Sequence, residues 1–259
     1  MLQQPSNINN QYATHTNEKV IEISDLYKSF GKNNHVLKGV NFQVNRGENL
    51  VVLGKSGSGK SITIKCLVRL VEADRGNIKV FDTDITTLND VELNKVRVKI
   101  GFLFQNAALY DSMTVRENLE FPLLRHSKKI SAIDAENAII ESLDSVGLAE
   151  AIDKMPSELS GGMRKRIGLA RTLILKPEII LYDEPTTGLD TITSREISEL
   201  ILAIQKKNKT TSIIITHDMA CAKLTGDRII ILKNGIIDAE GSYEELENSK
   251  DEWVRSFFI

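Results

Sequence analysis

The sequence predicts an α/β fold with a mainly parallel sheet, an N-terminal antiparallel β subdomain and an inserted α-helical subdomain. Short apolar runs at 50–53, 179–182 and 212–215 are typical of strands that are buried on both faces. Apolar residues then recur at helical spacing, as they do from 197 to 204, and strands that alternate with helices indicate a parallel sheet. A helical stretch from about 106 to 164 interrupts this alternation, which indicates the inserted subdomain.

The two ends of the predicted domain supply the antiparallel strands. Apolar residues occur in strand-like patterns around 20–23 and 40–44, and Asn234-Gly235 predicts a tight hairpin. Residues 1–18 are polar and contain few apolar side chains, so burial cannot offset the entropy cost of ordering them. We therefore expect a disordered polar tail at 1–18, followed by one domain that spans 19–259.

Two capping patterns predict where helices of the inserted subdomain begin. Thr114 precedes Glu117, and Ser131 precedes Asp134, each at the spacing of a capping box ahead of apolar residues. Gly147 is a plausible stop for the second of these helices.

Composition excludes several classes of protein. Lys plus Arg (33) nearly balances Asp plus Glu (35), so no overall basic field indicates a nucleic-acid partner, and we expect none. Cys66 and Cys221 have neither a disulfide pattern nor metal-ligand spacing, and we expect both in the core of a cytoplasmic protein. The apolar runs fall short of the roughly 20 residues that span a bilayer. We expect no signal peptide, so a membrane role requires a partner.

A complete phosphate-loop motif, G-x-x-x-x-G-K-S, follows the first buried strand. Its glycines allow backbone N–H groups to surround an anion, and a helical pattern from 64 to 71 follows, which presents a helix N-terminus to the same anion. Lys60 is expected to reach the β- and γ-phosphates, and the Ser61 hydroxyl to bind Mg²⁺. A glycine-rich turn with a stray lysine is the alternative, but the flanking strand and helix argue against it. The candidate residues are Gly54, Lys55, Ser56, Gly57, Ser58, Gly59, Lys60 and Ser61.

Two further segments carry groups that suit phosphate chemistry. Asp183 and Glu184 end the buried run at 179–182, where ligand sites of parallel sheets collect. Asp183 can hold Mg²⁺, and Glu184 can act as general base toward water, although an isolated Asp-Glu pair is usually a solvated turn. Leu-Ser-Gly-Gly-Met at 159–163 opens a helix and forms either a second anion-binding end or a simple N-cap with flexible glycines.

Together these motifs resemble those of the ABC ATPase family, whose fold is a P-loop NTPase (RecA-like) core. The resemblance extends from about residue 20 to the end. After the phosphate loop come Gln105 of the Q-loop, the signature at 159–163, the Walker B strand at 179–184, the D-loop at 188–190 and the switch residue His217. The family signature usually reads L-S-G-G-Q. Met163 replaces that Gln but leaves the hydroxyl and both glycines.

The resemblance implies a homodimer in which MgATP on one phosphate loop is covered by the signature of the other copy. Ser160, Gly161 and Gly162 would therefore contact the partner's ATP, and Asp190 would lie at the dimer seam. His217 would bind the γ-phosphate and hold Glu184.

The resemblance also implies roles for single residues at the nucleotide. Gln105 would contact Mg²⁺ and the attacking water, and Ile62 would join the nucleotide site. Phe30 would stack on adenine; a core aromatic at position 30 and the nearby Tyr27 are the alternatives. The catalytic set would be Glu184, His217, Gln105 and Lys60, and the metal ligands Ser61, Gln105 and Asp183.

The cargo is indicated by the segment 102–118, which looks like the Q-loop region of the ATPases in Mla/Mce-type lipid transporters. These ATPases share L-S-G-G-M and a D-E-P-T-[TA]-G-L-D run, present here at 159–163 and 183–190. The resemblance implies transport of phospholipid or another hydrophobic molecule across the cell envelope. It also implies integral-membrane permease subunits, an Mce-type substrate-binding protein, and a place on the cytoplasmic face of the inner membrane.

Other functions remain open at this stage. The same ATPase could serve a polar-solute importer or a lipoprotein exporter, although the stretch at 111–114 argues against both, or it could be an ATP-driven signalling switch. A P-loop kinase does not explain the signature or His217, and a DNA-repair ATPase would need coiled-coil insertions or tandem cassettes. Trp253, Phe257 and Phe258 could pack on the domain or on a partner.

Overall fold

Two sheets form the framework of the protein in this computed structural model, which describes residues 18–31, 33–126 and 130–258. The larger sheet has six strands, of which β9 to β6 run parallel and β10 is antiparallel to β9. In sheet order they are β10 (Ile236–Gly241), β9 (Arg228–Lys233), β3 (Asn49–Leu53), β8 (Thr211–Ile215), β7 (Ile179–Asp183) and β6 (Ile100–Leu103). The mainly parallel sheet predicted from the sequence is confirmed. The expected disorder of the tail concerns residues 1–17, which lie outside the described residues.

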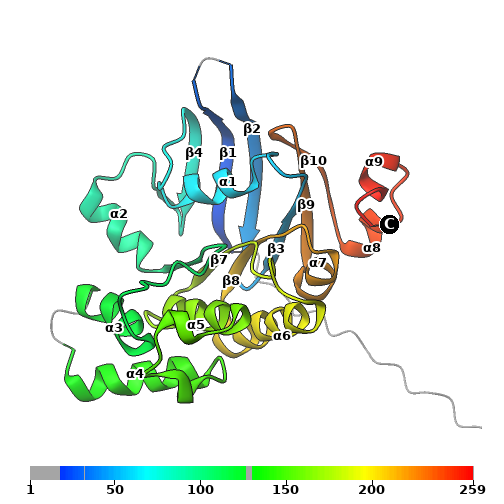
Figure 1. Cartoon of the computed structure of the whole chain (residues 1–259). Coiled ribbons are helices and arrows are strands. Elements are labelled where there is room, and N and C mark those ends of the chain that lie inside the picture. The colour runs from blue at the N-terminus through cyan, green and yellow to red at the C-terminus, as the bar shows by residue number, and fades with distance from the viewer. Residues whose placement is uncertain (1–17, 32, 127–129, 259) are drawn as a thin grey trace, which may run out of the picture.

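The smaller sheet is antiparallel and confirms the predicted N-terminal β subdomain. Its strands, in sheet order, are β2 (His35–Asn45), β1 (Lys19–Ser29), β4 (Arg75–Val80) and β5 (Thr83–Asp84). Figure 1 shows helix α1 between the two sheets, while α3 to α6 lie on the opposite side of the larger sheet.

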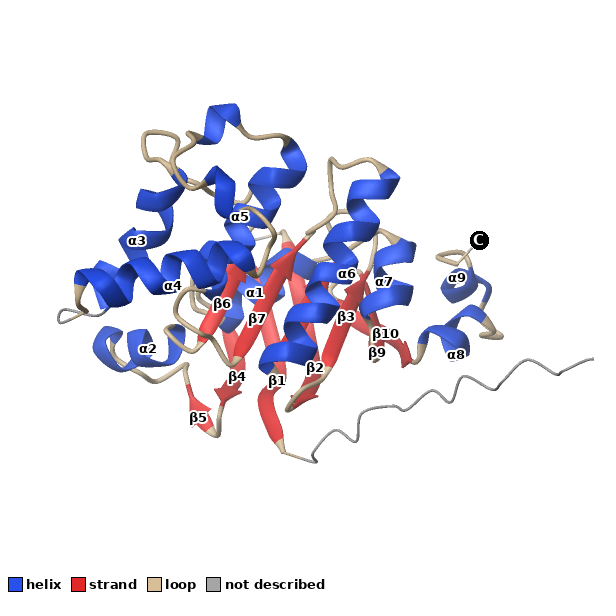
Figure 2. Ribbon diagram, turned by 90° about the horizontal axis from the view of Figure 1, so that it is seen from below, coloured by secondary structure: helices blue, strands red, loops and turns tan. Residues whose placement is uncertain are grey.

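The helices occupy the connections between strands, and Figure 2 shows α6 and α7 beside the larger sheet. The α-helices are α1 (Lys60–Leu67), α2 (Asp90–Arg97), α3 (Val115–His126), α4 (Ala132–Asp144), α5 (Gly161–Leu173), α6 (Thr191–Asn208), α7 (Met219–Thr225), α8 (Tyr243–Glu247) and α9 (Glu252–Arg255). Short 3₁₀ turns, η1 (Ala149–Ala151) and η2 (Pro156–Glu158), lie between α4 and α5. The boundary of the helical subdomain at 106–164 stays a prediction.

The strands of the larger sheet are buried on both faces, as their apolar runs predict. In β7, Ile179 and Leu181 join the core that β1, β2 and α1 cover, whereas Ile180 and Tyr182 join the core beneath the helices. Since successive side chains of a strand point to opposite faces, each residue is committed to one of two cores. This arrangement fixes the strand register, because a slip by one residue would exchange the two sets.

Local signals in the sequence agree with the structure, with one exception. The Thr114 backbone N–H donates to Glu117 Oε2 at 2.7 Å, and Ser131 caps α4 by accepting from the Asp134 N–H. Asn234 and Gly235 form the tight β9–β10 turn, with φ of 51° and 85°. The helix expected to continue to 71 instead ends at Leu67, because the chain turns through left-handed backbone conformations two residues later.

Asn118 holds the loop that precedes α3. Its side chain is fully buried, and its Oδ1 accepts from the Tyr110 N–H at 2.8 Å. Its Nδ2 lies 2.9–3.1 Å from the carbonyl oxygens of Tyr110, Met113 and Thr114. One side chain therefore fixes the path of residues 110–114.

We expect Asn118→Ala to lower the free energy of unfolding by about 2–3 kcal/mol, because buried backbone groups lose their partner. Chemical denaturation measures this change. The matched control is Asn137→Ala, at an exposed position of α4, which should change stability by less than about 0.5 kcal/mol. Equal effects of the two substitutions would contradict the bracing role of Asn118.

Candidate functional site

Four neighbouring parallel strands deliver the predicted motifs to one edge of the sheet. In sheet order, β3 leads into the phosphate loop, β8 into the His217 loop, β7 into Glu184 and β6 into the Gln105 loop. The carboxyl ends of parallel strands meet at one edge, which is where open α/β sheets bind ligands. Residues far apart in the sequence are thereby brought together.

The phosphate loop curls tightly between β3 and α1. Gly54, Gly57 and Gly59 have φ values of 156°, 79° and 108°, a region in which side chains are strained. A Cβ on Gly54 would also lie 2.5 Å from the Leu232 carbonyl oxygen. These conformations leave room for backbone N–H groups to face an anion at the start of α1.

Lys60 lies inside this loop and is almost wholly buried. Its Nζ donates to the carbonyl oxygens of Gly54 at 2.8 Å and Lys55 at 3.3 Å. Burial lowers the pKa of Lys60, and the carboxylates of Glu184 and Asp183 partly oppose that shift. The loop therefore holds a desolvated cation that lies ready for a phosphate.

Ser61 and Asp183 are joined by a 2.7 Å hydrogen bond from Ser61 Oγ to Asp183 Oδ1. A hydroxyl and a carboxylate are hard oxygen ligands of the kind that Mg²⁺ prefers, and this ion keeps waters and phosphate oxygens in its remaining positions. Among the described residues, no group of three or more His, Cys, Asp and Glu side chains forms a metal site. The Ser61–Asp183 pair fits Mg²⁺ with phosphate as co-ligand.

Glu184 has a strained backbone and a well-positioned side chain. Its φ is 53°, which is uncommon for a residue other than glycine and is found at functional sites. Its Oε2 lies 2.7 Å from His217 Nδ1 and accepts from Thr187 Oγ1 at 3.1 Å. Its Oε1 lies 4.0 Å from Lys60 Nζ.

A cavity of about 890 Å³ opens over the phosphate loop. Most predicted nucleotide residues line it, together with Asn34, Val36 and Phe257, which the sequence did not suggest. Predicted residues on its wall are Phe30, Gly54, Lys55, Ser56, Gly57, Gly59, Lys60, Ser61, Ile62, Gln105, Glu184 and His217. Ser58 is buried, and its Oγ has no hydrogen-bond partner in the described structure.

Phe30 is the aromatic residue at the rim of this cavity. Its side chain is 46% exposed, so it is not a core aromatic. Tyr27 does not line the cavity; its ring packs against Gly39 and under the Arg75 guanidinium. Only Phe30 of the two candidates can therefore face a ligand there.

The aromatic residues near the C-terminus pack on the domain itself. Trp253 contacts Phe257, and Tyr243 contacts Phe258, both edge to face at about 5 Å. Lys233 Nζ lies 3.8 Å from the centre of the Trp253 ring. Phe257 thereby reaches the nucleotide cavity, a contact that sequence spacing could not show because it depends on how α8 and α9 fold back.

The signature does not line the cavity of its own chain. Ser160 caps α5, accepting at Oγ from the Met163 N–H at 3.2 Å. Because this cap uses the backbone of residue 163, replacing Gln by Met there leaves it intact, and the Met163 side chain packs on the core. Gly161 faces a separate cavity of about 290 Å³ beside Gln105.

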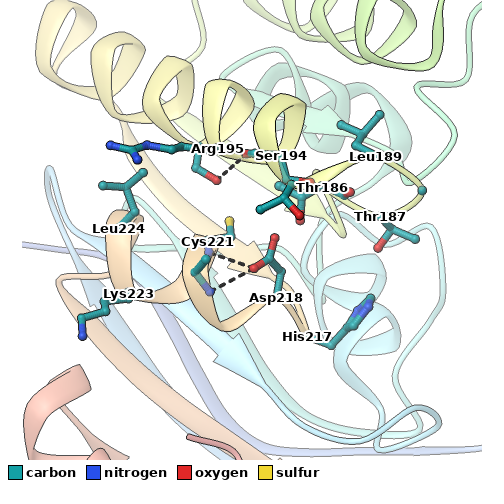
Figure 3. A pocket seen from close by; sticks show the side chains of 14 residues that line it. Thr186, Thr187, Leu189, Ser194, Arg195, His217, Asp218, Cys221, Lys223 and Leu224 are labelled. Atoms are coloured by element: carbon teal, nitrogen blue, oxygen red, sulfur yellow. Dashed lines mark hydrogen bonds between the residues drawn. The ribbon is translucent and has the colours of Figure 1, made fainter. Parts of the chain in front are cut away.

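Asp190 also has a structural contact that the sequence did not reveal. It caps α6, accepting from the N–H groups of Ile192 and Thr193 at 3.0 Å, and these bonds with the Thr193 hydroxyl lower the pKa of Asp190. A cavity of about 820 Å³ lies nearby, between α6 and α7. Figure 3 shows Ser194 and Arg195 on one side of it and Cys221 and Leu224 on the other.

Two buried cations of α5 hold the Q-loop, and sequence reasoning did not single them out. Lys165 Nζ donates to the carbonyl oxygens of Gln105 at 2.5 Å and Glu184 at 3.0 Å, and burial lowers the pKa of Lys165 to about 8. Arg171 donates to the carbonyl oxygens of Ala107 and Ala108 at 3.0 and 2.8 Å. For Lys165 the available signal was position, since residues four and eight places later are leucines of the buried face.

A groove of about 590 Å³ lies beside the Q-loop, between α2, α3 and α5. Its lining includes Arg97, Arg125, His126 and Arg171 but no Asp or Glu. Aromatic rings line it too, including Phe102 stacked on Phe104 and Tyr110 edge to face with Phe121. The groove combines positive charge with apolar surface.

Comparisons with known proteins agree with this geometry. A family model described as ABC transporter matches residues 37–187. The probable ribonucleotide transport ATP-binding protein mkl of Mycobacterium leprae is 40% identical over 237 residues, 92% of this chain and 68% of that protein. The chloroplastic protein TRIGALACTOSYLDIACYLGLYCEROL 3 of Arabidopsis thaliana is 39% identical over 255 residues, 92% of this chain and 73% of that protein.

Solved structures give the same result. A dimeric post-hydrolysis state of the ATP-binding cassette MJ0796, bound to ADP and Pi, has a TM-score of 0.79 and 32% identity. The similarity covers 86% of this chain and 98% of that one. The predicted P-loop NTPase fold is thereby confirmed.

We expect Lys60→Ala to weaken ATP binding by about 10–100-fold, because a charged hydrogen-bond donor to phosphate is lost. Equilibrium titration with a fluorescent ATP analogue measures the affinity. Lys65→Ala, at the other end of α1, is the control and should bind like the wild type. Unchanged affinity in Lys60→Ala would remove the phosphate-loop assignment.

Proposed function

Since the chain belongs to the ABC transporter family of ATP-binding subunits, we propose that it drives a phospholipid or another hydrophobic molecule across the cell envelope through a separate permease. The general chemistry follows from the family. The chain is an ATPase that binds ATP with Mg²⁺, and such cassettes dimerise and work with membrane permeases. The cargo, the detailed roles of the residues and the remaining partners are proposals.

The contact between Glu184 and His217, next to Lys60, is the main support for the proposed mechanism. Thr187 and His217 engage Oε2 of Glu184, so we assign proton removal from the attacking water to Oε1. A carboxylate only accepts, so His217 Nδ1 carries a proton, and Nε2 can donate to the γ-phosphate when the ring is charged. Lys60 stabilises negative charge on the phosphates.

The proposed metal site is the pair Ser61 and Asp183, with Gln105 as the third candidate on the cavity wall. Mg²⁺ bound there would neutralise phosphate charge. Phe30 would stack on the adenine at the exposed rim, and Ile62 would complete the wall.

The proposed complete site needs two chains. Ser160, Gly161 and Gly162 lie outside the cavity of their own chain, although they form a helix N-terminus suited to an anion. We therefore place them on the ATP of a second copy, with Asp190 at the seam. Closure then binds ATP more tightly than the open state does, so hydrolysis favours opening.

The proposed permease site is the basic, aromatic groove beside the Q-loop. Its arginines and rings suit a short cytoplasmic helix with acidic and apolar side chains. Among the described residues, no helix is long and apolar enough to cross a bilayer. We place the chain on the cytoplasmic face of the inner membrane, bound to this permease, with an Mce-type substrate-binding protein in the complex and no nucleic acid.

The lipid cargo is supported by sequence features and by one relative. Met163 and the loop at 111–114 match Mla/Mce-type ATPases, and the Arabidopsis relative is named for a galactolipid. The mycobacterial relative is named for ribonucleotide transport, which favours a polar-solute importer as the second candidate. A lipoprotein exporter remains the other alternative from the sequence.

We expect Glu184→Gln to bind ATP and to lose hydrolysis by about 10²–10⁴-fold, because the amide cannot accept the proton from water. It should also accumulate as an ATP-bound dimer in size-exclusion chromatography. Glu199→Gln, on the exposed face of α6, should hydrolyse ATP at the wild-type rate. Wild-type turnover in Glu184→Gln would show that the base has been assigned wrongly.

The cargo proposal predicts that the ATPase, purified with its permease in mild detergent, retains phospholipid that mass spectrometry identifies. Addition of ATP should release this lipid in the wild type but not in a complex containing Glu184→Gln. Recovery of a periplasmic sugar- or nucleotide-binding protein instead would favour the polar-solute importer.

A further inference from the structure

We infer that Lys165 is a positioning residue for ATP hydrolysis, which ties the signature helix α5 to Gln105 and Glu184 of the same chain. The inference rests on the proposed roles of Gln105 and Glu184. It concerns a residue that binds their backbones rather than ATP, since Lys165 does not line the nucleotide cavity.

The contacts of Lys165 are short and enclosed. The residue is 5% exposed, and its ammonium lies 2.5 Å from Gln105 O and 3.0 Å from Glu184 O. An ammonium has three donors, and these two bonds span the loops that follow β6 and β7. One buried side chain therefore fixes the distance between the two loops.

Glu184 shows why such a bond matters. A residue other than glycine at φ 53° persists only where its surroundings hold it. The Glu184 N–H donates to Ile215 O at 2.9 Å, and its carbonyl accepts from Lys165. Both sides of the strained residue are thus fixed, and the direction of its carboxylate toward His217 follows from that backbone.

The Q-loop is held in the same way from the same helix. Ala107 and Ala108 both have positive φ, and Arg171 binds both of their carbonyl oxygens. Lys165 binds the loop at its start, at Gln105. Two turns of α5 therefore hold a strained loop at two points.

Helix α5 begins at the signature, so Lys165 lies where it can connect two ATP sites. The rise from Gly161 to Lys165 is roughly 6 Å along a stiff helix. A signature pulled toward the ATP of the partner would move Lys165, and with it Gln105 and Glu184 of its own site. We expect this linkage to contribute to cooperativity between the two sites.

A purely structural lysine predicts a different outcome. Burying an ammonium has a desolvation cost, and an apolar side chain of similar length often replaces a buried cation without loss of stability. Lys165→Met keeps the length and removes the donors. Lys165→Gln keeps N–H donors on a shorter, neutral side chain.

The test compares these variants in the full-length protein by steady-state ATP hydrolysis, ATP binding and thermal unfolding. We expect Lys165→Met to lower kcat by about 10–100-fold, since slight misplacement of catalytic groups has effects of this size. ATP affinity should stay within about twofold, and the Hill coefficient should fall toward one. Lys165→Gln should recover part of kcat.

The control is Arg166→Met, the neighbouring cation of α5, which binds the Val146 carbonyl and Glu196 away from the site. It should retain kcat within about twofold. The inference is overturned if Lys165→Met, or Lys165→Gln should the Met variant not fold, has wild-type kcat and cooperativity. A rise in KM at unchanged kcat would also overturn it, by indicating a nucleotide contact.

Glu184→Gln, assayed in parallel, separates this inference from the proposed function. Inactive Glu184→Gln with fully active Lys165→Met rejects only the positioning role. Active Glu184→Gln rejects the proposed function itself.

Discussion

The shared carboxyl edge of strands β3, β8, β7 and β6 is the constraint on which the site depends. These strands are not in chain order, because β8 inserts between β3 and β7. That insertion places His217 between the phosphate loop and Glu184, and it makes the 2.7 Å contact of His217 with Glu184 possible. The two apolar cores fix the register of each strand, so core packing determines where the polar groups emerge.

The active edge contains strain and buried charge that the rest of the fold stabilises. Glu184, Ala107 and Ala108 have left-handed backbones, and Lys60 and Lys165 have pKa values lowered by burial. Each such feature opposes folding, and strained functional sites are maintained by surroundings that define them strongly. Here the surroundings are carbonyl groups that accept from the buried cations and one helix, α5, that spans both loops.

Sequence patterns predicted features whose cause is local. The phosphate loop and the Asp183-Glu184 pair are recognisable because a motif adjoins a buried strand within a few residues. The partners of Lys165 lie 60 and 19 residues away, and no periodicity announces a hydrogen bond to a carbonyl. Phe257 reaches the nucleotide cavity only because α8 and α9 fold back on the domain. The roles assigned by resemblance to Ser160 and Asp190 need a second chain.

The position of Ser160 away from its own phosphate loop has a consequence for how the cell spends ATP. If each catalytic centre is shared, a newly made subunit that has met no companion is idle, whatever the nucleotide supply. Turnover in dilute solution should then grow with the square of subunit concentration. A permease that gathers two subunits would act as the template that starts the engine, so consumption of fuel would be confined to assembled machines.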